Sequence, residues 1–157
     1  MTNQVFAVAA FVMLFPVYAQ AASAPIALTG LVASSLHLSM ADLGEFPATH
    51  ITATQVSGRG PVPLDCTGAA LSAIIAKAGL NVGKGNNAKL AHSVVITADD
   101  GYGAALSLGE IDADYGNQNV IVATQCNGKM LDAPRLVVPG DRHAGRAVNG
   151  VVSIEVK

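Results

Sequence analysis

The chain has 157 residues, a formal net charge of −2, 51% hydrophobic residues and 13% charged residues. This length predicts one domain, and the composition excludes a disordered, collagen-like or coiled-coil protein. The sequence contains no Trp, only four Phe and three Tyr, and no run of basic residues. It therefore lacks the aromatic platforms and the positive surface with which proteins hold nucleic acids, and we expect no nucleic-acid partner.

Residues 1–21 are interpreted as a signal peptide. Residues 5–19 form an uncharged apolar stretch, and the pattern Ala19-Gln20-Ala21, with a small residue on each side of Gln20, suits a signal peptidase. The alternative is a membrane anchor, but about fifteen residues at ~1.5 Å rise span only ~22 Å of a ~30 Å hydrocarbon core, and Pro16 weakens a spanning helix. No twin-arginine pair is present, which indicates export in the unfolded state. We expect residues 22–157 to form the single mature domain, periplasmic or secreted, with no membrane association after cleavage.

Strands are predicted along the mature chain where β-branched and apolar residues cluster or alternate, and helices where capping residues precede an apolar face. The expected strands are 26–32, 49–55, 93–98, 103–108, 120–126, 129–131, 135–138 and 151–156. The expected helices are a short turn at 39–46 capped by Ser39, a main helix at 68–78 capped by Thr67, and a short helix at 109–115. Asn127-Gly128 is typical of a tight hairpin turn. The pattern predicts an α+β domain with a mixed or antiparallel sheet around one main helix.

Two cysteines, Cys66 and Cys126, lie in the predicted mature domain. In an oxidising compartment they would form a disulfide that closes a loop of about sixty residues, worth roughly 4 kcal/mol in the chain-entropy description. The alternative is two buried small side chains that behave as hydrophobic residues. The sequence alone leaves both interpretations open.

Cationic side chains gather between two predicted strands, in a segment that is rich in glycine. They are Arg135, Arg142, His143 and Arg146. Guanidinium groups and backbone amides at a strand end can converge on one anion, which predicts an anion or phosphate site. The alternative is a solvated polar loop with ion pairs to Asp132 and Asp141.

The other motifs predict no metal site. The four histidines lie far apart and lack the spacing of zinc ligands. The glycine-rich segment 79–85 follows the main helix instead of preceding one, so its amides extend no helix N-terminus and it does not predict a phosphate-binding loop.

Seven segments in order carry a resemblance to a known family: LTGLV, LSMADLGEFP, DCTGAALSAIIAKAG, ADDGYGAALSLGEI, ATQCNGKML, PRLVVPG and GRAVNGVVSIEV. Together they resemble the molybdopterin-binding domain of the sulfite oxidase superfamily over most of the mature chain. The resemblance implies a mixed α+β fold that holds a molybdenum pterin and oxidises or reduces small oxoanions or oxides.

The resemblance also assigns positions one by one. Val56 occupies the place of the family cysteine that ligates molybdenum, and a valine side chain cannot ligate. Arg135 matches the arginine that contacts the pterin phosphate, Arg146 matches a second family arginine, and Tyr102 stands in the Asp-Gly-Tyr motif. The family's histidine, lysine and tryptophan fall on Met130, Asn149 and Gly150.

These observations predict an exported protein of this fold that binds a small anionic or pterin-like ligand through Arg135, Arg142, His143, Arg146 and Tyr102. We expect no bound cofactor, molybdopterin being the one that the resemblance implies, and no catalytic residue is assigned. One alternative is an active molybdopterin-dependent oxidoreductase that uses Cys66 or Cys126 as its thiolate. The other is a cofactor-free periplasmic module that binds a protein partner.

Overall fold

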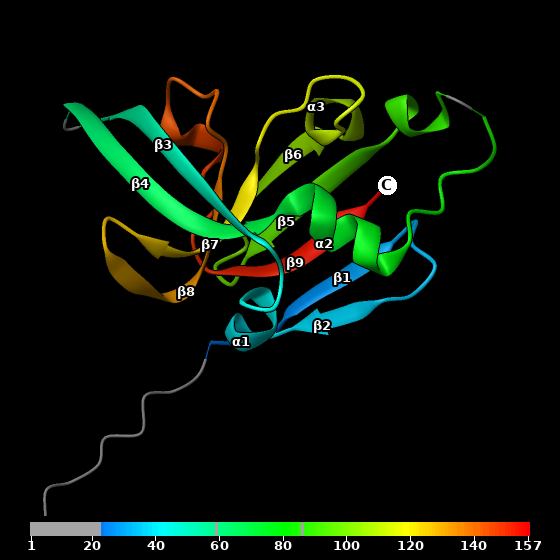
Figure 1. Cartoon of the computed structure of the whole chain (residues 1–157), viewed down its shortest axis with the longest axis horizontal. Helices are drawn as coiled ribbons and strands as arrows, with labels where there is room; N and C mark the ends of the chain where they lie inside the picture. Colours follow the sequence, from blue (N-terminus) through cyan, green and yellow to red (C-terminus); the bar gives the residue numbers. More distant parts are fainter. Residues whose placement is uncertain (1–22, 59, 86) are drawn as a thin grey trace, which may run out of the picture.

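The computed structural model describes residues 23–157 except residues 59 and 86, so the expected signal peptide lies outside the described residues. Within this part, the chain forms two β-sheets joined by short helices (Figure 1). The protein is therefore a β-rich α+β domain with two sheets and few helices. No described helix combines the length and the apolar run that crossing a membrane requires.

The larger sheet has five strands in the order β2-β1-β9-β5-β6. Their bounds are β1 Ile26–Gly30, β2 Leu36–Leu38, β5 Ser93–Ala98, β6 Gly103–Ser107 and β9 Val151–Val156. The first long strand, β1, pairs in parallel with the last strand, β9, and the other pairs are antiparallel. The sheet is thus mixed, and the two ends of the described chain meet at its centre.

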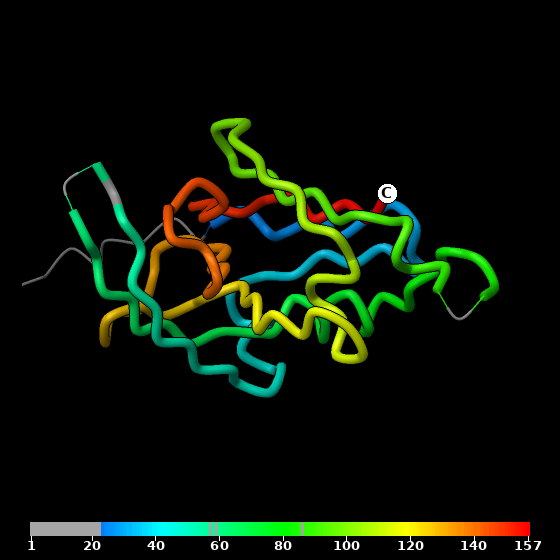
Figure 2. Tube along the Cα trace, turned by 90° about the horizontal axis from the view of Figure 1, so that it is seen from above, coloured from blue at the N-terminus to red at the C-terminus, as the bar shows by residue number. Residues whose placement is uncertain are grey.

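The smaller sheet has four antiparallel strands in the order β3-β4-β7-β8. Their bounds are β3 Ala48–Ser57, β4 Gly60–Ala70, β7 Ile121–Cys126 and β8 Lys129–Val137. Asn127 and Gly128 both have positive φ in the turn between β7 and β8, as the Asn-Gly pair predicts. The hairpin of β3 and β4 projects beyond the rest of the sheet (Figure 2).

The helices are short. They are α1 Met40–Leu43, α2 Leu71–Ala78 and α3 Leu108–Ile111, with 3-10 turns η1 Ala88–Ala91 and η2 Ala144–Arg146. The predicted Ser39 cap of α1 is confirmed, and Asp42 completes a capping box because its carboxylate accepts from the Ser39 amide at 2.7 Å.

In the region before α2, one cap prediction is wrong and one strand was not predicted. Thr67 does not cap the main helix, because residues 68–70 pair with β7 and the helix begins only at Leu71. Gly68 permits this pairing, since a Cβ there would lie 2.2 Å from the Val122 carbonyl oxygen. No strand was predicted between residues 56 and 92, but residues 60–70 form β4, in which Pro61 and Pro63 are accepted because they lie on an unpaired edge.

The main hydrophobic core lies between the two sheets. It combines strand residues of the larger sheet and residues of α2 with Ala69, Val122 and Leu136 of the smaller sheet. A second, smaller cluster covers the opposite face of the smaller sheet and includes Ile51, Cys66, Ala123 and Val137. Since neighbours along a strand point to opposite faces, Arg135 and Gln55 share the face of this second cluster.

Candidate functional site

The loop of residues 139–150, which contains η2, connects β8 to β9 and lies against both sheets. The Val56 amide of β3 donates to the Arg142 carbonyl at 2.7 Å, and the Val148 carbonyl accepts from the Leu136 amide at 2.8 Å. Isolated β-bridges join Val56 to His143 and Arg135 to Asn149. The cartoon and the Cα trace both place this loop beside the β3–β4 hairpin (Figures 1 and 2).

The loop brings most of the predicted site residues to one region. The Tyr102 hydroxyl donates to the Gly145 carbonyl. Arg142 and His143 are exposed, and Val56, the family's ligand position, lies directly against them. Arg142, His143 and Arg146 are therefore neighbours along one loop, which Tyr102 contacts from the turn between β5 and β6 and which has Arg135 at its base.

The positive charge of Arg146 is neutralised by carboxylates of the same chain. Its guanidinium donates to both Asp141 carboxylate oxygens at 2.9 and 2.6 Å, and to Glu110 at 3.0 Å. Asp141, followed by Glu110, raises the pKa of Arg146 above its ordinary value. The second oxygen of Glu110 accepts from the Ser107 amide that begins α3, so this ion-pair network fastens the loop to α3. Arg146 thus positions the loop and has little charge left for a ligand.

Arg135, in contrast, has a guanidinium nitrogen without a hydrogen-bond partner. Its Nε is buried and has no hydrogen-bond partner, and burial lowers the pKa of its guanidinium from the ordinary value. A guanidinium cannot lose its charge under physiological conditions, so an unpartnered buried N–H is costly. An anion in contact with Nε would remove this cost.

Two glutamines that the sequence reasoning missed also border the loop. Gln55 precedes Val56 and is only 2% exposed, yet neither its Nε2 nor its Oε1 has a partner. The Oε1 of Gln118 is likewise buried without a partner, and the Gln118 side chain lies beside Gly140. The only sequence feature that could have indicated the burial of Gln55 is the alternation of residues along β3, which places Gln55 on the same face as Ile51.

These atoms form a pattern. In the described part of the chain, every buried side-chain polar atom without a partner belongs to Gln55, Gln118 or Arg135. All three residues adjoin loop 139–150. Buried polar groups are normally paired, and an unpaired set that borders a single loop indicates a site for a polar ligand.

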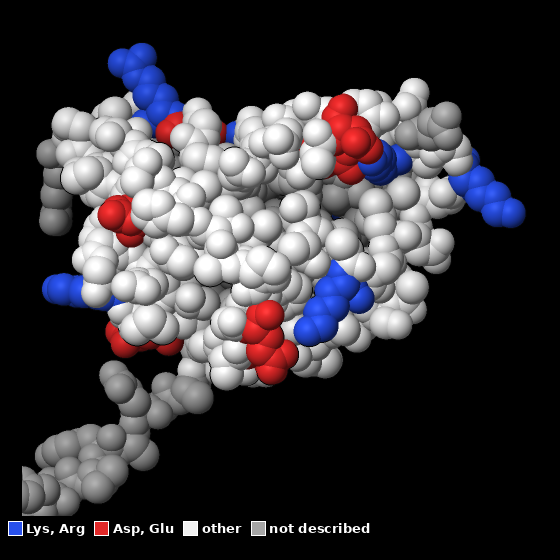
Figure 3. Space-filling model, in the orientation of Figure 1, with Lys and Arg blue, Asp and Glu red and all other residues white. Residues whose placement is uncertain are grey.

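Three hollows of the described structure have linings that contain none of Arg135, Gln55 and Gln118. One of about 190 Å³ includes Asp99, Asp132 and Gly150 in its lining, so its charged groups are acidic and do not suit an anion. Another of about 130 Å³ is mainly apolar and lies against α2 and α3. On the face shown in Figure 3 the basic side chains are scattered singly.

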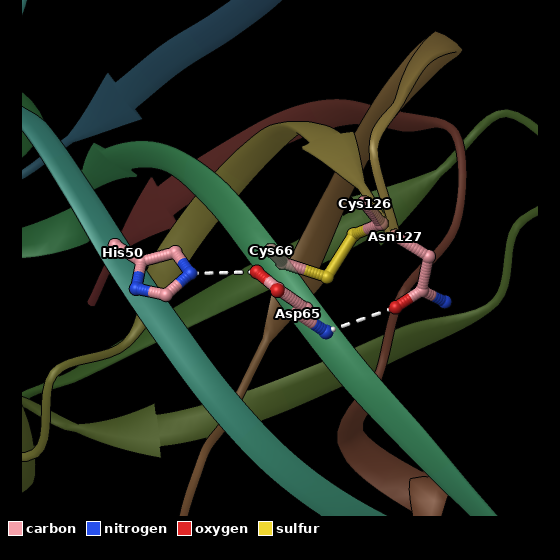
Figure 4. Close-up of a disulfide and its surroundings, with 5 residues drawn as sticks. All are labelled: His50, Asp65, Cys66, Cys126 and Asn127. Atoms are coloured by element: carbon pink, nitrogen blue, oxygen red, sulfur yellow. Dashed lines mark hydrogen bonds and ion pairs between the residues drawn. A yellow bond between two sulfur atoms is a disulfide. The ribbon is translucent and has the colours of Figure 1, made fainter.

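Cys66 and Cys126 form a disulfide with a Cα–Cα distance of 4.1 Å, and both side chains are buried in the second cluster (Figure 4). Next to it, Asp65 accepts from His50 at 2.6 Å across β3 and β4, and the Asp65 amide donates to the Asn127 side chain at 3.0 Å. Neither cysteine is a free thiolate.

These residues do not fit a molybdenum centre of the kind that the resemblance implies. Val56 offers no ligating atom, and both cysteines of the chain are bonded to each other. Within residues 23–157, apart from 59 and 86, no three His, Cys, Asp or Glu side chains group as metal ligands. The hypothesis that Cys66 or Cys126 replaces the family thiolate is therefore wrong for the protein in this oxidised form.

Comparison with solved structures identifies the class of fold. The chain is similar to the sulfane dehydrogenase SoxCD from Paracoccus pantotrophus, with a TM-score of 0.68, 21% sequence identity and coverage of 85% of this chain. This similarity shows that the chain shares its fold with part of SoxCD, and it supports the molybdopterin-binding oxidoreductase-like fold that the resemblance in the sequence implies.

The same comparison covers only 38% of the SoxCD chain, so this protein spans well under half the length of that neighbour. No protein-family profile matches the sequence. No curated protein matches it either. The likeness therefore establishes the fold and leaves the activity to be argued from the residues.

Proposed function

We propose that this chain is an exported binding protein that uses the molybdopterin-binding oxidoreductase-like fold without its metal chemistry. Its ligand would be a small anionic or pterin-like molecule held between Arg135, Gln55 and loop 139–150. The observation that carries this proposal is the set of buried, unpartnered polar atoms gathered at that loop.

The atom types restrict the ligand. Arg135 Nε and Gln55 Nε2 need acceptors, whereas the Oε1 atoms of Gln55 and Gln118 need donors. A bare anion satisfies only the first pair. A molecule that has an anionic group and N–H donors, as a phosphorylated pterin has, satisfies both.

The test is ligand-dependent thermal stabilisation of the purified protein. Inorganic phosphate should raise the melting temperature slightly, and a pterin that carries a phosphate ester should raise it more, because a ligand at 100 times its Kd adds about 2.7 kcal/mol of stability. Arg135→Met should abolish both shifts. Lys129→Met, which removes an exposed cation from the same strand, should retain them.

Equal shifts in Arg135→Met and the unmodified protein would refute the proposal. The molybdenum content of protein purified from its native compartment separates the alternatives, since stoichiometric molybdenum would favour an active oxidoreductase. Export is proposed as part of the same function and is supported by the disulfide. The mass of the native protein should match residues 22–157, and a mass that includes residues 1–21 would contradict signal cleavage.

A further inference from the structure

The outer edge of β3 carries backbone groups without a partner strand. β3 is the terminal strand of its sheet, and its register with β4 is continuous from Ala48 to Ser57. The Val56 amide points away from β4, because it donates to Arg142 at 2.7 Å. Backbone direction alternates along a strand, so His50, Thr52 and Thr54 also direct their N–H and C=O groups outward.

The opposite strand confirms this direction. The Asp65 carbonyl accepts from the Asn127 amide at 2.7 Å, on the side of β4 that faces β7. Thr52 is the register partner of Asp65, so this pair shares no backbone hydrogen bonds. The described structure contains no partner for the outward backbone groups of His50, Thr52 and Thr54.

The two edges of the hairpin differ in their protection. On the outer edge of β4, Pro61 and Pro63 have no N–H to offer, and Asp65 is bound to Asn127 (Figure 4). Prolines and lysines are the usual means of blocking a sheet edge. The outer edge of β3 has neither between Ala48 and Val56.

The remaining edge strands are less suitable for pairing. β2 has three residues, β6 has five, and β8 contains Pro134. β3 is ten residues long, and four of its alternate residues, Ala48, His50, Thr52 and Thr54, are exposed. At its base β3 is joined to β4 by the exposed His50–Asp65 pair, and the disulfide joins β4 to β7.

We propose that this edge is the contact surface for a second copy of the chain, with the two β3 strands antiparallel about a two-fold axis at Thr52. The free stretch runs from Ala48, where β3 begins, to Val56, where Arg142 already occupies the edge, and Thr52 is its midpoint. Pairing centred there places the occupied end of one strand opposite the beginning of the other. The two smaller sheets become one continuous sheet.

The side chains suit this register. Thr52 faces Thr52 of the second copy, and Thr–Thr pairs are favourable across antiparallel strands. His50 faces Thr54 of the second copy, so no like charges are opposed. Three residue pairs make a small contact. We therefore expect the dimer to have a dissociation constant in the micromolar range and to be populated at ~0.2 mM protein.

Cysteine cross-linking tests the register. Directly opposed residues have Cα atoms ~5.5 Å apart, within disulfide reach, so Thr52→Cys should form a covalent dimer under mild oxidation. Thr54→Cys is the matched control, because four residues of offset separate the two thiols by ~13 Å. Efficient cross-linking of Thr52→Cys alone supports the proposal. Equal cross-linking of both variants, or of neither, overturns it.

Proline substitution tests the edge itself. Thr52→Pro removes an N–H that has no partner within the chain, so it should keep the melting temperature of the monomer and abolish the dimer in light scattering at ~0.2 mM. Thr52→Val keeps the N–H and should still dimerise. A monomeric unmodified protein at this concentration, or a dimeric Thr52→Pro variant, overturns the proposal. If Thr52→Pro does not fold, the cysteine pair decides.

Discussion

At the residue scale, Gln55 is the described residue whose buried side chain lacks a hydrogen-bond partner at both of its polar atoms. It is 2% exposed, and its amide has neither a donor nor an acceptor as a partner. A buried polar group without a partner costs about 1–3 kcal/mol. A ligand bound beside Val56 and loop 139–150 would offset this cost by supplying the missing hydrogen-bond partners.

Gln55→Met tests this reasoning. The substitution keeps the size of the side chain and removes the unpaired amide, so without ligand it should raise the free energy of unfolding by about 1–3 kcal/mol. It should also remove the stabilisation by a phosphorylated pterin. Urea denaturation in phosphate-free buffer measures the first effect and thermal melting the second.

Thr54→Val is the control, because this residue is exposed on the same strand and its substitution should change stability by less than about 0.5 kcal/mol. A Gln55→Met protein that is less stable than the unmodified one would show that the amide has a partner within the folded chain.

Part of the candidate site was recognised in the sequence. The basic loop was recognised from its composition, and Asp141 was anticipated as an ion-pair partner of that loop. Glu110 was not anticipated, because it lies 36 residues from Arg146 in the chain. Gln55 was missed because its burial depends on the fold around it, which strand alternation alone does not reveal.

At the element scale, the sequence predicted correctly those features that depend on contacts between neighbouring residues. The Ser39 cap and the Asn127-Gly128 turn depend on neighbouring residues, and both were recovered. The start of α2 was wrong because pairing of residues 68–70 with β7 overrides a capping preference. The outer half of β4 was not predicted as a strand because it contains prolines. Only the order of strands in the sheet shows that this edge is unpaired and can accept them.

The disulfide joins adjacent strands but closes a long segment. Cys66 and Cys126 are 60 residues apart in sequence, and the segment between them contains α2, β5, β6 and α3. Replacing both by alanine should therefore lower the free energy of unfolding by about 4 kcal/mol, because the unfolded chain regains the freedom of that loop. Urea denaturation curves of the two proteins give the difference.

The unmodified protein treated with a thiol-alkylating reagent without reductant serves as the control and should keep its midpoint. Labelling of two cysteines in this control would show that the disulfide is absent. An unchanged midpoint in the double alanine variant would mean that the bond does not restrict the unfolded chain.

At the scale of the whole molecule, the parallel pairing of β1 with β9 is the feature that no local pattern predicts. It joins residues near 27 to residues near 153, and it places both ends of the described chain in the middle of the larger sheet. The two sheets then share one core, in which Leu136 and Val122 of the smaller sheet pack with residues such as Ile154.

A shared core predicts that the two sheets unfold together. Native-state hydrogen exchange, followed by mass spectrometry of peptides, should give the same opening free energy for the slowest amides of β9 and of β7. The turn at 127–130, where Met130 is 70% exposed, should exchange much faster and provides an internal reference. If β7 opened at a lower free energy than β9, the smaller sheet would be a separate cooperative unit, and the ligand site at its edge could then form and dissolve independently of the larger sheet.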